Sequence, residues 1–124
     1  MSLQQILSFI PAMAGLVALI IGLLAVITPA KASKGFGIEA SGPALHYVVA
    51  TGVRDIFIGL IMLVLYWHGD TKIIGACFIC IAVVAIADFT LTFKHGSKKQ
   101  SVVHAAGAIF SIIYGSLVIL QVGL

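Results

Sequence analysis

A chain of 124 residues that is 61% hydrophobic and only 9% charged has too little polar surface for a soluble fold. The composition therefore excludes a soluble domain and predicts one integral membrane domain over residues 1–124. The formal charge of +3 could suit nucleic acid, but the lysines gather in short segments between apolar runs, which indicates a membrane surface as the partner and no nucleic acid.

The first apolar segment covers about 3–28 and holds no charged residue, and it is long enough to cross a hydrocarbon core of ~30 Å. It exceeds the apolar core of about 7–15 residues in a signal peptide, and no basic residue precedes it, so we expect a retained helix. Gly15, Ala18, Gly22 and Ala25 recur at helical spacing, and such a stripe of small residues is typical of closely packed membrane helices.

Residues 29–45 contain two prolines and several glycines, which break helices, together with the apolar Phe36 and Ile38. This composition predicts a loop that lies at the membrane interface or dips into it. The second apolar segment, about 46–67, ends in Tyr66 and Trp67, which are typical interfacial anchors.

The third and fourth apolar segments cover about 72–93 and 102–122, and the lysine-rich residues 94–101 separate them. Four helices joined by short loops predict an all-α, four-helix transmembrane bundle with up-down-up-down topology. Small and polar residues share one face of the fourth helix, where they could pack within the chain or form a homodimer: His104, Gly107, Ala108, Ser111 and Gly115.

Lysines distinguish the two sides of this bundle, since five lie in residues 29–45 and 94–101 and only Lys72 lies on the other side. The positive-inside rule then places 29–45 and 94–101 in the cytoplasm and both termini outside, in an inner or plasma membrane.

Arg54 and Asp55 interrupt the second apolar segment, where a charge costs roughly 2.5–3.5 kcal/mol to insert and often marks a functional site. They lie roughly 12 Å from the cytoplasmic start of their helix, and Asp88 lies roughly 9 Å deep on the third helix. We therefore predict an ion pair between Arg54 and Asp88. Asp55 would then face His104 or Tyr47.

These residues define a predicted ligand site in the cytoplasmic half of the membrane, formed by Arg54, Asp55, Asp88 and His104, with Tyr47, Thr51 and His46 at its edge. Arg54 would bind an anionic or carbonyl group or hold Asp88, while Asp55 and His104 would exchange protons or hydrogen bonds. The apolar outer half suits a lipid-like or aromatic tail, so the expected function is binding or transport of a small hydrophobic or amphipathic molecule.

Other functions stay open at this point. An isomerase-like or cyclase-like membrane enzyme would use Asp55 or Asp88 as a general acid, although the chain has no recognised catalytic motif. A structural partner subunit would need no ligand, and the ion pairs would then only fix the helix register.

The cysteines and histidines suggest two cofactors that we do not predict. Cys77 and Cys80 have the spacing of a thiol–quinone oxidoreductase, but such enzymes need a second cysteine pair, so small packing residues are the simpler interpretation. His46 and His104 lie too near the helix ends for a haem site, and no metal-binding motif occurs.

Motifs spread along the chain resemble an uncharacterised family of small four-span membrane proteins that carries a domain-of-unknown-function label. They are Pro29, Phe36-Gly37, the run Ala50 to Asp55, Gly59 and Ala87-Asp88. The resemblance implies an Arg-Asp pair in helix two and an aspartate in helix three, and it implies no chemistry. The size is also similar to that of small multidrug exporters, but their acidic residue in helix one is missing here.

Overall fold

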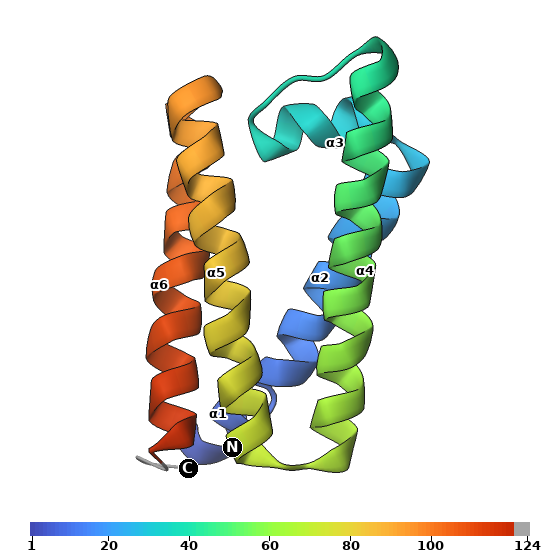
Figure 1. Ribbon diagram of the computed structural model, residues 1–124. Coiled ribbons are helices and arrows are strands. Elements are labelled where there is room, and N and C mark those ends of the chain that lie inside the picture. The colour runs from blue at the N-terminus through green and yellow to red at the C-terminus, as the bar shows by residue number, and fades with distance from the viewer. Residues whose placement is uncertain (121–124) are drawn as a thin grey trace.

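The computed structural model describes residues 1–120, which form helices and no strand (Figure 1). The elements are α1 (Leu3–Ser8), α2 (Ile10–Ile27), α3 (Pro29–Phe36), a 3₁₀ turn (Gly42–Ala44), α4 (Leu45–His68), α5 (Thr71–His95) and α6 (Lys98–Ile119). Four spans are long and apolar enough to cross a membrane, with α1 and α2 together forming the first. The predicted all-α fold of four membrane-spanning helices is confirmed.

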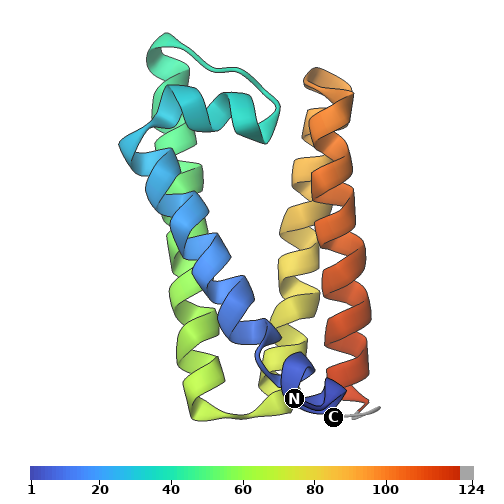
Figure 2. The same cartoon turned by 180° about the vertical axis from the view of Figure 1, so that it is seen from behind.

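The long helices run alternately up and down, and α3 lies across one end of them (Figures 1 and 2). This end also carries the turn between α5 and α6, and we call it the lysine-rich end because Lys31, Lys34, Lys94, Lys98 and Lys99 lie there. The opposite end carries α1, the turn between α4 and α5, and the last described turn of α6.

The bundle consists of two closely packed helix pairs, α2 with α4 and α5 with α6, and the two pairs touch each other much less. Glycines bring α2 and α4 together, with Gly15 opposite Gly59 and Gly22 opposite Gly52. A Cβ atom on Gly22 would lie 2.6 Å from the carbonyl oxygen of Gly52, so no larger residue fits there without moving a helix. The small-residue stripe predicted on the first helix is therefore an intramolecular packing surface.

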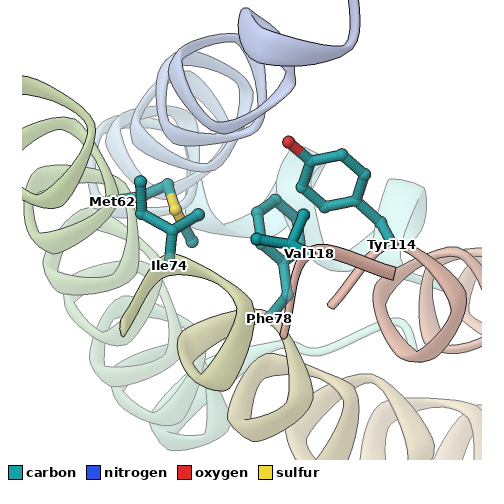
Figure 3. Packing of buried hydrophobic residues seen from close by; sticks show 5 residues of the cluster. All are labelled: Met62, Ile74, Phe78, Tyr114 and Val118. Carbon is teal, nitrogen blue, oxygen red and sulfur yellow. The ribbon is translucent and has the colours of Figure 1, made fainter. Parts of the chain in front are cut away.

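Facing glycines also bring α5 and α6 together, at Gly75 and Gly115, where a Cβ atom on Gly115 would lie 2.7 Å from the carbonyl oxygen of Gly75. At the opposite end, buried side chains from three helices join the two pairs. Figure 3 shows this cluster, which contains Met62 from α4, Ile74 and Phe78 from α5, and Tyr114 and Val118 from α6.

The first span is broken at Phe9, whereas its apolar sequence predicted one uninterrupted helix over about 3–28. Pro11 explains the break, because it has no N–H group to donate to the carbonyl of Leu7. The hydroxyl of Tyr114 donates to that carbonyl instead, at 2.9 Å. Tyr114 thereby ties α1 to α6.

Two segments predicted as loops are partly helical. Within 29–45, Pro29 occupies the first turn of α3, where a missing N–H group has no cost, and Gly37 ends the helix with a positive φ of 110°. Within 94–101, only Gly96 and Ser97 lie outside the helices, because the Ser97 hydroxyl accepts a hydrogen bond from the Gln100 N–H and starts α6 early. The predicted end of the fourth helix, at about 122, lies outside the described residues.

Candidate functional site

The guanidinium of Arg54 on α4 binds two carboxylates at once, and we call Arg54, Asp55 and Asp88 the charge triad. Its Nη1 and Nη2 atoms donate to the Oδ1 and Oδ2 atoms of Asp88 on α5, at 3.2 and 3.1 Å. Its Nε and Nη2 atoms both lie 3.0 Å from Oδ1 of Asp55. The predicted ion pair between Arg54 and Asp88 is confirmed, and its two parallel bonds have the geometry of a strong Arg–carboxylate pair.

The partner of Asp55 differs from the prediction, which placed it against His104 or Tyr47. Neighbouring residues on a helix leave the axis about 100° apart, but this limit applies to the Cβ directions and not to the end of a long side chain. The Arg54 side chain is long enough for its Nε atom to reach the carboxylate of Asp55, the next residue in the chain. Arg54 therefore forms ion pairs with both carboxylates, and Asp55 does not need a partner on another helix.

The charge triad carries one positive and two negative charges, so its net charge is −1 when all three groups are ionised. Asp88 is 9% exposed, and the Arg54 and Asp55 side chains are 34% and 18% exposed. Most donor positions of the guanidinium already face carboxylate oxygens. An anionic group would thus meet a saturated arginine and an excess of negative charge.

An apolar groove of ≈ 160 Å³ lies between α4 and α5, one helical turn from the charge triad toward the opposite end. We call it the α4–α5 groove, and its lining residues are Phe57, Ile58, Ile61, Cys77, Cys80, Ile81 and Val84. Phe57 follows Arg54 by three residues and Val84 precedes Asp88 by four, so the groove continues the helix faces that carry the ion pair. Another hollow, of ≈ 370 Å³, lies near Trp67 and His68, far from these charges.

The two cysteines line this groove as free thiols, Cys77 partly buried and Cys80 exposed. Their neighbours in the groove are all hydrocarbon side chains. The surroundings favour the interpretation of both cysteines as apolar wall residues.

Helix α3 reaches from the α2–α4 pair to the α5–α6 pair at the lysine-rich end, where its C-terminus contacts α6 and the turn before it. His104 Nε2 lies 2.9 Å from the carbonyl oxygen of Phe36, and the two rings lie 4.6 Å apart between centroids. A carbonyl oxygen only accepts, so this nitrogen carries the hydrogen. Ser97 N–H donates to the carbonyl oxygen of Gly37 at 2.8 Å, which fixes the end of α3.

The other predicted site residues lie at the start of α4. His46 is exposed and Tyr47 is 79% exposed, while the Thr51 hydroxyl donates to the carbonyl oxygen of Tyr47 at 3.0 Å. None of these three contributes a hydrogen bond to the charge triad among the described residues.

Sequence reasoning missed the groove and the contact between α3 and His104. The groove has no sequence signal, because it depends on the distance between two helices. The contact of α3 with the turn between α5 and α6 had a sequence signal, because Gly37 ends α3 and Gly96 lies in that turn, and the two glycines allow close approach. Thr92 is fully buried beside Gly37, and its hydroxyl has no hydrogen-bond partner within the described part of the chain.

Fold and site together define a small, four-helix integral membrane protein with an Arg–Asp–Asp cluster inside the bundle. A family model described as a domain of unknown function, DUF4267, matches residues 15–118, and the chain belongs to this family. Comparison with curated proteins and with solved structures finds no match.

Proposed function

We propose that this protein binds a small amphipathic molecule within the membrane. Its apolar part would occupy the α4–α5 groove, and its polar end would lie at the charge triad. The observation that carries this proposal is the position of the groove, which begins one helical turn from Arg54 and Asp88 on the same two helices. A polar cluster next to an apolar cleft is the usual form of a small-molecule site.

The charge of the triad suggests which polar end fits. Because Arg54 is shared by Asp55 and Asp88, one negative charge is left over when both carboxylates are ionised, in surroundings where charges are poorly screened. An ammonium group or another hydrogen-bond donor would offset that charge, whereas a carboxylate or phosphate would add to it. The proposed ligand therefore has a cationic or donating head, and Arg54 has the role of holding Asp88.

The volume of the groove limits the apolar part. A closed cavity of about 150 Å³ lined by aliphatic and aromatic side chains holds one benzene molecule. The α4–α5 groove has ≈ 160 Å³ and a similar lining, so it suits one ring or a short stretch of alkyl chain. The buried cluster of Met62, Phe78 and Tyr114 packs against Cys77 and Ile81 of the groove wall, so we propose binding and not transport across the membrane.

A second candidate role is that of a structural clasp, and the paired hydrogen bonds between Arg54 and Asp88 favour it. A clasp would hold the two helix pairs together and need no ligand. Both roles predict a loss of stability when Arg54 is removed, so stability alone does not separate them.

Binding to the purified protein separates the two roles. Native mass spectrometry would follow titrations of dodecylamine, which is protonated at neutral pH, and of dodecanoic acid. We expect saturable and preferential binding of dodecylamine, and its loss in Val84→Trp, which fills the groove. Val83→Trp is the matched control, because Val83 is 67% exposed on another face of the same helix and should bind dodecylamine like the wild type. Equal binding by Val84→Trp, or equal binding of both probes, would contradict the proposal.

A further inference from the structure

The lysine-rich end gathers positive charge from two segments that are far apart in the sequence. Lys31 and Lys34 lie on α3, while Lys94, Lys98 and Lys99 lie around the turn between α5 and α6. The hydrogen bond from Ser97 N–H to the Gly37 carbonyl oxygen joins these segments, and the contact between Phe36 and His104 lies beside it. Lys34 is three residues from Gly37 and Lys98 follows Ser97 directly, so this hydrogen bond brings the two lysine-bearing segments together.

All five lysines are exposed, and little negative charge opposes them. Among residues 1–120, Glu39 is the single acidic residue outside the spanning part of the helices at this end, and its carboxylate lies 3.7 Å from the Lys34 ammonium with both side chains well exposed. Such a pair leaves both groups available to other charges. Among the described side chains, the opposite end has Lys72 together with Asp70, which carry opposite charges.

The orientation of the lysine-bearing segments suits a membrane surface. Helix α3 lies across the ends of the spanning helices, so its length runs along the plane of the bilayer surface (Figures 1 and 2). Its lysines are exposed, while Ser33 on the same helix is buried. The Lys98 ammonium lies 4.8 Å from the centroid of the Phe93 ring, which keeps its stem against the apolar surface at the headgroup level.

We propose that the lysine-rich end is a binding surface for anionic phospholipid headgroups of the adjacent leaflet. The surface needs α3 docked on the turn between α5 and α6, because only then do the two groups of lysines form one patch. This inference is independent of the ligand proposed for the charge triad, since no triad residue belongs to the patch.

The test is a lipid titration of the full-length protein in a neutral detergent, followed by native mass spectrometry. The probes are dioleoylphosphatidylglycerol and dioleoylphosphatidylcholine, which differ in headgroup charge. We expect preferential binding of phosphatidylglycerol, and a loss of about fivefold in affinity for each lysine removed in the series Lys34→Gln, Lys98→Gln and Lys99→Gln. Binding should also weaken as the screening length falls from ~10 Å at 0.1 M salt to ~3 Å at 1 M.

Lys72→Gln removes the same charge at the opposite end and is the matched control, which should keep the wild-type preference. Circular dichroism should show the same helix content in all variants, because the lysines are exposed. The proposal is wrong if the triple variant binds phosphatidylglycerol like the wild type, or if Lys72→Gln loses as much. Displacement of the lipid by millimolar inorganic phosphate would also overturn it, since the surface would then bind a free anion.

Discussion

Neutralising the three members of the charge triad one at a time should give unequal losses of stability. Arg54→Met leaves two unpaired carboxylates next to each other, whereas Asp55→Asn leaves the Arg54–Asp88 pair intact and removes the surplus charge. The order of destabilisation should therefore be Arg54→Met first, Asp88→Asn second and Asp55→Asn last.

The magnitudes follow from the contacts. Leaving a buried charge without its partner costs about 3–5 kcal/mol, and we expect about 3 kcal/mol for Arg54→Met because one third of that side chain is not covered by protein. Asp88→Asn weakens one charge-assisted hydrogen bond and removes the other, because an amide NH2 group cannot accept from the guanidinium, and it should cost about 2 kcal/mol. Asp55→Asn keeps one acceptor oxygen for Arg54, so it weakens the bonds to that oxygen and relieves repulsion, and its effect should stay within about 1 kcal/mol.

The assay is reversible unfolding in mixed micelles with increasing dodecyl sulfate, followed by circular dichroism. The variant with Arg54→Met, Asp55→Asn and Asp88→Asn combined provides the internal check. It contains no unpaired charge, so it should be more stable than Arg54→Met alone. The reasoning is refuted if Asp55→Asn costs as much as Arg54→Met, or if the three single losses simply add in the combined variant.

Two further predictions concern the packing. Gly22→Ala should destabilise the fold by about 1–3 kcal/mol, because its Cβ atom would meet backbone atoms of α4 at 2.6 Å, while Gly107→Ala, with open space around it, should be neutral or stabilising in the same unfolding assay. Tyr114→Phe should cost about 1–2 kcal/mol by leaving the Leu7 carbonyl without its donor. That cost should shrink in a Pro11→Ala background, where residue 11 regains an N–H group for the same carbonyl, and an unchanged cost in the double variant would show that the hydrogen bond is not the cause.

The sequence predicted those contacts of the site that follow from the sign of a side chain's charge and from its depth in the membrane. A charge inside the membrane needs a partner, and Asp88 was the acidic residue at a similar depth on the next helix, so the pairing with Arg54 followed. The partner of Asp55 was not predictable in this way. It depends on the rotamer of Arg54, because the end of a long side chain can reach a neighbour on its own helix as easily as a residue on the next helix.

Helix α3 shows a different limit of prediction from the sequence. Its proline and glycines are signals for a loop, but their positions matter more than their presence: Pro29 stands where a helix tolerates proline, and Gly37 stands where a helix ends in the left-handed conformation. Reading these positions would have predicted a short helix. That α3 crosses the bundle and touches His104 depends on tertiary contacts that no local pattern records.

The α4–α5 groove and the reach of Arg54 have one structural cause. The close-packing face of α4, at Gly52 and Gly59, is used against α2, so α4 meets α5 through larger side chains such as Phe57. These side chains keep the two helices apart and leave the groove between them. Only a long side chain can cross that distance, and only a guanidinium can bind both oxygens of Asp88 once it arrives. A lysine at position 54 would have the charge but not the paired geometry, so the two parallel hydrogen bonds to Asp88 depend on arginine.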